Sequence, residues 1–536
     1  MNRSLVAAAM LGAASVLGFA PFGLFPLPLL TLAGLFALWR RSGSPLAAAL
    51  LGFVWGLGFF LAGVSWVYVS LHDVGGMAAP LAALATLLFC SYLALFPALV
   101  GYVFRRVAGR PLAVEGAPRS GGATAASGMR DASHEAAATA SASTVASPRT
   151  GPLLRAPASP DFLRPLRDAL LVAGLWTLAE WLRGTLFTGF PWLALGYSQS
   201  PPSPLAGYAP LVGSYGLAFV VALLAALLAF AWRRFWPTLL VVAVIAFGFV
   251  LRGIGWTEPV GAPLRVVLLQ GNVPQSLKWD PNRLSLSIET YLRLAQANPA
   301  QLTVLPETAI PLLFDEVPRD VLRGLTANGE VVLGVAVRTT QGGYVNGAVA
   351  LKPELRSQGY AKSHLVPFGE FVPPGFAWFF DLVSIPMSNF TAGPARQPPL
   401  VVAGQNIMPN ICYEDLFGEE IIRALPEATL LLNISNTAWF GDSLAQPQHL
   451  QISQLRALET GRPMLRATNT GMTAAVAPDG TVSAVLAPFT RDALRVEVRG
   501  YQGATPYGRR GNWPALLLAV LACLPSLPLL RLRRSA

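Results

Sequence analysis

Three residues in the second half of the chain have the types that nucleophilic catalysis requires, and each stands in a short motif punctuated by proline or glycine. Glu307 ends LTVLPE, Lys362 lies in YAKSHLVPFGE, and Cys412 ends the apolar run in MPNIC. A free thiol has a pKa of about 8.5, so a cysteine nucleophile needs a base or a nearby positive charge. We predict Cys412 as nucleophile, Glu307 as its proton acceptor, and Lys362 as the charge that stabilises Glu307 and the tetrahedral oxyanion.

Other catalytic constellations are poorly supported by the sequence. The four histidines are dispersed, and no histidine, cysteine and carboxylate cluster has metal-ligand spacing. We therefore predict no metal and no cofactor. For His364, which lies two positions after Lys362, we predict a structural hydrogen bond. The histidines are His72, His134, His364 and His449.

The elements expected to position the three residues are those of a layered α/β domain over residues 263–500. Short β-branched runs alternate there with amphipathic segments, and chemistry in such folds gathers at strand ends. The expected strands are 264–270, 302–305, 331–337, 345–351, 407–411, 429–434 and the hairpin 474–485, with helices at 284–297 and 446–460.

Composition rules out a single soluble domain. Of the 536 residues, 53% are hydrophobic and only 12% are charged, against about 25% charged in ordinary soluble domains. Disorder is also excluded, because it requires low hydrophobicity. The three cysteines, Cys90, Cys412 and Cys523, cannot form a disulfide framework, since two of them lie in apolar runs.

Eight apolar segments predict a polytopic α-helical membrane protein, because a spanning helix needs roughly 20 apolar residues. Arginine pairs follow alternate spans, which predicts a cytoplasmic N-terminus and an extracytoplasmic α/β domain. For the same reason the net charge of +11 is interpreted as a topology signal and not as a nucleic-acid surface. The segments are the two halves of residues 5–39, then 46–71, 80–104, 169–182, 211–232, 235–251 and 513–530.

The predicted domain order follows from these segments. Transmembrane helices one to four occupy residues 1–106 and helices five to seven residues 164–256. Residues 107–163 are dominated by Ala, Ser, Gly, Pro and Thr, which predicts a disordered, low-complexity cytoplasmic loop. The catalytic domain covers 263–500, and a C-terminal transmembrane helix covers 513–530.

The motifs around these residues resemble the nitrilase superfamily, whose members use a Glu-Lys-Cys triad in an αββα sandwich. The closer resemblance is to a membrane-bound branch, the apolipoprotein N-acyltransferase family. It covers nearly the whole chain except residues 107–162. The matching stretches are QGNVPQSLKW at 270–279, PETAIP at 306–311, KSHLVPFGEFVP at 362–373, ICYE at 411–414, ISNTAWFG at 434–441, TPYGRRGNW at 505–513, AEWLRG at 179–184 and GFPWL at 189–193.

The resemblance implies a two-step acyl transfer in the bacterial inner membrane, with the catalytic domain on the periplasmic side. A membrane phospholipid, typically phosphatidylethanolamine, would acylate Cys412 as a thioester. The N-terminal amine of S-diacylglyceryl-cysteine on an apolipoprotein would then accept the acyl chain. Two alternatives stay open at this point: a membrane-tethered nitrilase-type amidase or hydrolase, and a non-enzymatic transporter with a degenerate sensing domain.

The resemblance also implies roles for residues beyond the triad. Glu370, eight positions after Lys362, is expected to support the triad geometry. The alternative role for this residue is a surface ion pair. Tyr413 and Glu414 flank the nucleophile and match the family's functional pattern. Trp279 and Trp439 are candidates for acyl-chain contacts or lid positions, although they suit core positions as well. Trp378 lies in an exposed-looking apolar arm at 376–380, which suits the membrane surface. The substrate-binding candidates are therefore Trp279, Trp378, Asn436 and Trp439.

Overall fold

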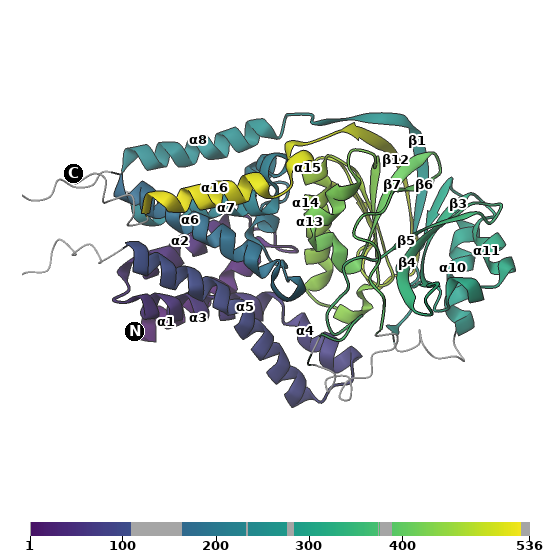
Figure 1. The fold of residues 1–536 in the computed structure, drawn as a ribbon, viewed down its shortest axis with the longest axis horizontal. Coiled ribbons are helices and arrows are strands. Elements are labelled where there is room, and N and C mark those ends of the chain that lie inside the picture. The colour runs from purple at the N-terminus through teal and green to yellow at the C-terminus, as the bar shows by residue number, and fades with distance from the viewer. Residues whose placement is uncertain are drawn as a thin grey trace, which may run out of the picture.

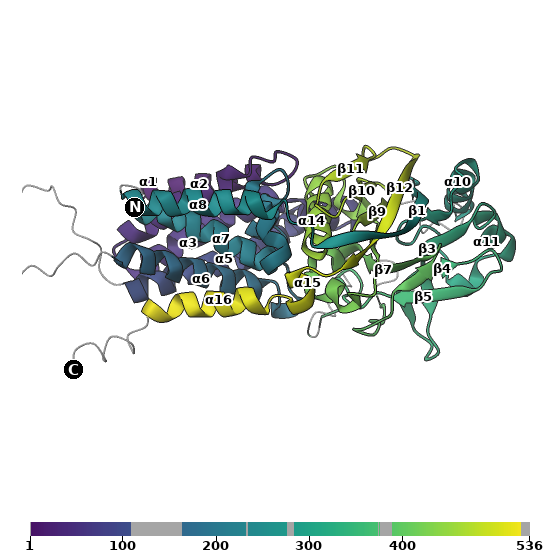
Figure 2. The same ribbon diagram turned by 90° about the horizontal axis from the view of Figure 1, so that it is seen from above.

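The computed structural model describes residues 2–108, 163–231, 234–275, 284–373, 375 and 389–526. Within these ranges the chain forms two parts, a helical bundle and an α/β sandwich, that lie end to end (Figure 1). The helices α1 to α8 and the late helix α16 make up the bundle, and everything between α8 and α16 belongs to the sandwich (Figures 1 and 2). The predicted loop at 107–163 lies almost entirely outside the described residues.

Each apolar segment predicted to cross a membrane contains a helix. Proline at the first positions starts several of them, where its missing N–H costs nothing, and Ser44 caps α3 by accepting a hydrogen bond from the N–H of Ala47. The bundle helices are α1 (Asn2–Ser15), α2 (Pro26–Arg41), α3 (Pro45–Gly63), α4 (Trp66–Val69), α5 (Ala79–Ala108), α6 (Arg164–Arg183), α7 (Ala209–Ala231), α8 (Phe235–Leu251) and α16 (Trp513–Cys523).

Three helical stretches of the described chain are long and apolar enough to cross a bilayer, namely Pro45–Gly63, Ala79–Ala108 and Pro204–Ala231. The stretches Phe235–Leu251 and Trp513–Ser526 are apolar but shorter. By length and composition the bundle therefore has membrane character, whereas the number of eight spans stays a prediction.

Large apolar side chains point outward from the bundle. On α8, Leu239, Val242 and Phe249 are 56%, 57% and 67% exposed, whereas its buried residues are only Pro237, Gly248 and Leu251. Such a continuous apolar surface is uncommon on a water-soluble protein and suits a lipid environment.

The sandwich consists of two six-stranded sheets, each with a parallel centre and antiparallel edges. The first sheet has the order β12-β1-β2-β3-β4-β5, and the second has the order β11-β10-β9-β8-β7-β6. In the first sheet β1 to β3 run parallel, and in the second β7 to β9 do. The strands are β1 (Thr257–Gln270), β2 (Leu302–Val304), β3 (Glu330–Arg338), β4 (Tyr344–Leu351), β5 (Ser357–Ala361), β6 (Leu400–Val402), β7 (Gln405–Ile411), β8 (Leu430–Ser435), β9 (Met464–Thr468), β10 (Ala474–Val476), β11 (Val482–Val485) and β12 (Asp492–Gly503).

Helices cover the outer faces of both sheets, which gives the αββα layering implied by the nitrilase resemblance. Helices α10 (Leu284–Ala297) and α11 (Arg319–Leu325) cover the first sheet at the end far from the bundle (Figure 1). Helices α13 (Gly418–Ile421) and α14 (Ala445–Thr460) lie between the second sheet and the bundle, and α15 (Pro506–Arg510) leads back to α16 (Figure 1).

Helix α14 joins the two parts of the molecule into one packed unit. All but two of its residues are buried, because one face packs against the second sheet and another against the bundle. Its Ile452 and Leu455 belong to the same apolar cluster as the interior of the bundle. The second sheet, which carries Cys412, is thus the sheet that lies nearer the membrane helices.

Candidate active site

The fold brings the three predicted catalytic residues to the ends of strands. Glu307 follows β2 and Lys362 follows β5, both in the first sheet, whereas Cys412 follows β7 in the second sheet. All three side chains are buried, with 6%, 1% and 9% of their residues' surface exposed. Such burial is unusual for charged residues unless they are paired.

Glu307 and Lys362 form one buried cluster with Glu370. The ammonium Nζ of Lys362 lies 2.8 Å from Glu370 Oε2 and 3.7 Å from Glu307 Oε1. Glu370 therefore makes the closer ion pair with the lysine, as expected for a residue that supports the triad. Its Oε2 also accepts a hydrogen bond from the N–H of Val366 at 2.8 Å, which fixes the loop after β5.

Asn346 on β4 completes this cluster, although it is not among the predicted site residues. Its Nδ2 donates to Glu307 Oε1 at 2.7 Å and to Glu370 Oε1 at 2.8 Å. The backbone carbonyl of Asn346 also accepts a hydrogen bond from the backbone N–H of Lys362 at 2.8 Å. In the sequence Asn346 is a lone amide in a largely apolar run, without a spacing signal, and the structure leaves it only 3% exposed.

Asn436, predicted as a substrate-binding candidate, lies directly after β8 and contacts the proposed base. Its backbone N–H donates to Glu307 Oε2 at 2.7 Å. Its side chain donates to Gln275 at 2.8 Å and accepts from Asn469 at 3.2 Å. The two oxygens of Glu307 are therefore held by donors from different sheets, and this orients the carboxylate.

Burial and neighbouring charges together raise the pKa values of both Cys412 and Lys362. Burial raises the pKa of the Cys412 thiol, and the negative charge of Glu307 raises it further, although Lys362 opposes both effects. Burial alone would lower the pKa of Lys362, but the carboxylates of Glu370 and Glu307 outweigh burial and raise it. The resting site therefore holds a protonated thiol and a charged ammonium, so thiol attack requires a base.

Cys412 occupies a strained position at the start of the turn Cys412–Leu416. Its φ of 54° lies in the left-handed region, a backbone conformation that residues other than glycine rarely adopt. Strain of this kind persists only where the surroundings fix it, and it is common at active sites.

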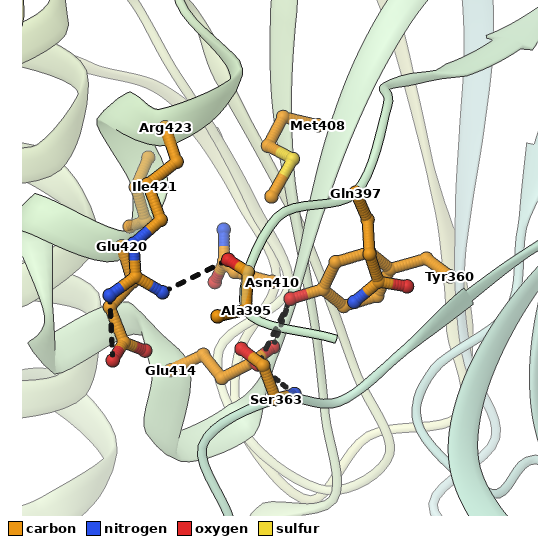
Figure 3. Close-up of a pocket in the computed structure, with 10 residues that line it drawn as sticks. All are labelled: Tyr360, Ser363, Ala395, Gln397, Met408, Asn410, Glu414, Glu420, Ile421 and Arg423. Atoms are coloured by element: carbon orange, nitrogen blue, oxygen red, sulfur yellow. Dashed lines mark hydrogen bonds and ion pairs between the residues drawn. The ribbon is translucent and has the colours of Figure 1, made fainter. Parts of the chain in front are cut away.

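Glu414 ties the loop that carries Lys362 to this turn. Its carboxylate accepts from the N–H of Ile411 at 2.7 Å, from the N–H of Ser363 at 2.7 Å and from the hydroxyl of Tyr360 at 2.9 Å. Figure 3 shows Tyr360 and Ser363 pointing toward Glu414 at one side of a small pocket. Burial raises the pKa of Glu414, and the bond from Ile411 opposes this shift. Through these hydrogen bonds Glu414 connects the loop after β5 to the turn of Cys412.

Two other predicted residues connect the site to the helical bundle. The hydroxyl of Tyr413 donates to the carbonyl of Gly189 at 2.5 Å, in the loop after α6. The carbonyl of Trp439 accepts from the hydroxyl of Ser70 at 2.8 Å, directly after α4. Through these contacts the turn of Cys412 and the segment after β8 lie against the helical bundle.

The remaining predictions concern two tryptophans, His364 and metal ligands. Trp279 and Trp378 lie outside the described residues. His364 stacks on Phe417 with ring centroids 3.7 Å apart, and its Nδ1 lies 3.2 Å from Glu420, in keeping with the expected structural role. Across the parts of the chain that the structure describes, no group of three or more His, Cys, Asp or Glu side chains is arranged to hold a metal ion.

The class of protein follows from the fold, the site and the family matches together. Residues 265–507 match the Carbon-nitrogen hydrolase family, so the sandwich is a nitrilase-type domain. Residues 11–120 and 136–227 match the Apolipoprotein N-acyltransferase N-terminal domain. The chain belongs to the apolipoprotein N-acyltransferase family, and the resemblance found in its motifs is confirmed.

Individual relatives agree with this assignment. The chain is similar to the apolipoprotein N-acyltransferase of Nitrosomonas europaea, with 46% identity over 97% of this chain and 96% of the relative. It is also similar to the apolipoprotein N-acyltransferase of Ralstonia nicotianae, with 44% identity over 97% of this chain and 92% of the relative. Among solved structures it is similar to a CN-hydrolase superfamily protein from Xanthomonas campestris, with 19% identity, a TM-score of 0.35, and coverage of 48% of this chain and 97% of that one.

Proposed function

We propose that this protein transfers a fatty acyl chain from a membrane phospholipid, through a thioester on Cys412, to the N-terminal amine of S-diacylglyceryl-cysteine on apolipoproteins. Family membership supports lipoprotein N-acylation over the hydrolase and transporter alternatives. The observation that carries the mechanism is the fixed, buried pairing of Glu307 with Lys362, which the fold brings to the site of the buried thiol of Cys412.

In the first step Glu307 takes the proton of the Cys412 thiol as Sγ attacks the ester carbonyl of the phospholipid. Lys362 and a backbone N–H near Tyr413 stabilise the tetrahedral oxyanion. The intermediate then collapses, the carbon–oxygen bond of the ester breaks, and Glu307 returns the proton to the departing glycerol oxygen. The products are a thioester on Cys412 and a lysophospholipid.

In the second step the amine of the apolipoprotein attacks the thioester carbonyl. Glu307 takes a proton from the attacking amine and delivers it to Sγ as the carbon–sulfur bond breaks. The result is an amide on the lipoprotein and a regenerated thiol, so the cycle is ping-pong. No metal or cofactor is required, because the proton and the charge are handled by Glu307 and Lys362.

Both substrates are anchored in a bilayer, which fits the position of Cys412 on the sheet nearer the bundle. We take phosphatidylethanolamine as the donor and the periplasmic face of the inner membrane as the location, with eight spans and a cytoplasmic N-terminus. The outward apolar surface of α8 and the contact of Tyr413 with the loop after α6 support this placement.

The topology is tested by reporter fusions at two positions. Because arginine pairs follow alternate apolar segments, a reporter fused after Leu251 should be active on the extracytoplasmic side, and one fused after Arg106 on the cytoplasmic side. Opposite results at both positions would overturn the arrangement.

The function is tested with purified protein in vesicles that contain phosphatidylethanolamine with labelled acyl chains and a synthetic S-diacylglyceryl-cysteine peptide. We expect labelled chains to appear in amide linkage on the peptide. Release of labelled free fatty acid at the same rate with and without the peptide would instead identify a hydrolase.

A further inference from the structure

A row of buried polar residues crosses the second sheet directly behind Cys412. Asn410 on β7 is the register partner of Asn433 on β8, and Asn433 is the partner of Arg466 on β9. Cross-strand partners share a face of the sheet, so the three side chains lie side by side. None is more than 1% exposed. Burial of an amide or a guanidinium among apolar residues is unfavourable unless the group is hydrogen-bonded, so this row requires an explanation.

Hydrogen bonds run along the row and end at the nucleophile. Arg466 Nη1 donates to Asn433 Oδ1 at 2.6 Å. The amide Nδ2 of Asn433 in turn donates to Asn410 Oδ1 at 2.6 Å and to the carbonyl oxygen of Cys412 at 3.4 Å. Arg466 is thereby connected through one side chain to the backbone of Cys412.

Arg466 also contacts the far end of the turn that holds Cys412. Its Nη1 lies 3.5 Å from Asp415 Oδ2 and 3.2 Å from the hydroxyl of Ser453 on α14. Ser453 donates a short hydrogen bond to the same carboxylate oxygen of Asp415. The turn Cys412–Leu416 is therefore held at its first residue through Asn433 and at its fourth through Asp415, and it contains the strained φ of Cys412.

The charges of Arg466 and Lys362 both act on the thiol, and the two cations come from different sheets. Lys362 approaches Cys412 from the first sheet, whereas Arg466 lies in the second sheet. Glu307 and Glu370 favour the neutral thiol, and both cations favour the thiolate. Other titratable groups near this turn are Tyr413, Glu414 and Asp415 within it, Tyr197, whose hydroxyl donates to the carbonyl of Leu416 at 3.3 Å, and Arg456, whose charge acts on Asp415. His449 on α14 is uncharged, because burial lowers its pKa well below the ordinary value.

We propose that Arg466 is a positioning residue for the nucleophile, which fixes the turn of Cys412 through Asn433 and Asp415 and supplies, together with Lys362, the positive charge that favours the thiolate during attack. This inference rests on the proposed role of Cys412. Because alkylation of Cys412 needs no lipid substrate, its rate tests Arg466 independently of the acyl transfer reaction.

The experiment measures the rate at which iodoacetamide alkylates Cys412 in the full-length protein in detergent micelles, from about pH 7 to about pH 9.5. Peptide mass spectrometry assigns the adduct to Cys412. The variants are Arg466→Met, which removes the charge, and Arg466→Lys, which keeps it. The matched control is Arg462→Met, because Arg462 is equally buried but bonds to the carbonyls of Ala428 and Gly503, away from the nucleophile.

We expect alkylation of Arg466→Met to be about 10-fold slower at a given pH, which corresponds to about one pKa unit. Arg466→Lys should alkylate within about threefold of the wild type. It should nevertheless form the acyl adduct several-fold more slowly, since the shorter lysine side chain cannot place its ammonium where Nη1 of Arg466 contacts both Asn433 and Asp415. Arg462→Met should alkylate as the wild type does, even if its melting temperature falls.

Wild-type alkylation rates in a folded Arg466→Met variant would overturn the proposal. So would an equal slowing in Arg462→Met, which would indicate general loosening of the domain. If Arg466→Met does not fold, Arg466→Lys decides: alkylation within about threefold of the wild type supports the charge, and a 10-fold loss contradicts it. Retained acyl transfer in Cys412→Ala would refute the proposed function instead, whatever the alkylation rates.

Discussion

The two sheets of the sandwich contribute different residues to the proposed chemistry. The first sheet supplies Glu307, Asn346 and Lys362, which are held together by hydrogen bonds and an ion pair before any substrate binds. The second sheet supplies Cys412 on a strained turn and lies nearer the bundle. In the proposed mechanism, proton transfer and oxyanion stabilisation thus depend mainly on the first sheet, and bond formation depends on the second. The site exists only when the two sheets pack face to face.

Removal of the nucleophile should have the largest effect. Cys412→Ala should abolish both half-reactions, because no other thiol in the described chain lies at the site. Cys90 is buried within α5, and Cys523 lies at the end of α16, 3.9 Å from the carbonyl of Leu171. The measurement is transfer of labelled acyl chains to the acceptor peptide, with Cys90→Ala and Cys523→Ala as controls that remain active. Turnover in Cys412→Ala would refute the assignment.

Two variants separate the roles proposed for Glu307 and Lys362, which both belong to the first sheet. Glu307→Gln keeps the shape but cannot accept a proton, so acylation of Cys412 should slow by about 10²- to 10⁴-fold. Lys362→Ala should slow it by about 10²- to 10³-fold, through loss of oxyanion stabilisation. The measurement is formation of the acyl adduct with phospholipid alone.

The pH dependence distinguishes these two variants. The pKa of the Cys412 thiol is raised by burial and by Glu307, so the thiolate fraction increases as pH rises toward that pKa. Between about pH 7 and about pH 9.5, rising pH should partly rescue Glu307→Gln, which lacks only the base. Lys362→Ala should gain less, because a thiolate does not restore oxyanion stabilisation. Equal rescue of both variants would contradict this division of roles.

Loss of Asn346 should have an intermediate effect. Asn346→Ala removes the hydrogen bonds that hold Glu307 and Glu370 together, and each bond to a charged group is worth about 1.5–3 kcal/mol. We expect acylation to slow by about 10- to 100-fold while Cys412 still reacts with iodoacetamide. Asn328→Ala is a suitable control, since Asn328 bonds only to the end of α10 among the described contacts. Equal losses in both variants would indicate a stability effect alone.

The smallest effect is expected for the contact between the second sheet and the bundle. Tyr413→Phe removes one hydrogen bond, from its hydroxyl to the carbonyl of Gly189, but keeps the packing against Phe417. A neutral hydrogen bond contributes about 1 kcal/mol, so the transfer rate should fall by no more than about 10-fold. A complete loss of acyl-adduct formation would show that the hydroxyl takes part in the chemistry.

The sequence predicted the parts of this account that depend on local patterns. Alternating apolar runs located most strands of the sandwich, and Pro- and Gly-punctuated motifs located Glu307, Lys362 and Cys412. The strands β5, β6, β9 and β12 were not predicted. β5 is largely polar, β6 has only three residues, and β9 has an arginine in its centre. β12 does alternate apolar and charged residues from Leu494 to Arg499, and this signal was missed. Their pairing is decided by neighbouring strands that are distant in sequence.

Asn346 and Arg466 could not be predicted for a related reason. Each is a single polar residue in a largely apolar strand, and its partners lie in loops, strands or a helix that are distant in sequence and meet only in the folded domain. A lone amide or guanidinium gives no spacing signal in the sequence. The left-handed backbone of Cys412 is likewise a property of the folded turn, because nothing in the residue type demands it.

The most direct test of the central claim is mass spectrometry of Cys412 in a single-turnover experiment. Purified protein is first incubated with phosphatidylethanolamine alone and then mixed with the S-diacylglyceryl-cysteine peptide. We predict an acyl thioester on Cys412 that forms without the peptide, disappears when the peptide is added, and is matched by an equal amount of acylated peptide. Acylated peptide that forms without any adduct on Cys412, or an adduct that the peptide does not discharge, would contradict the account.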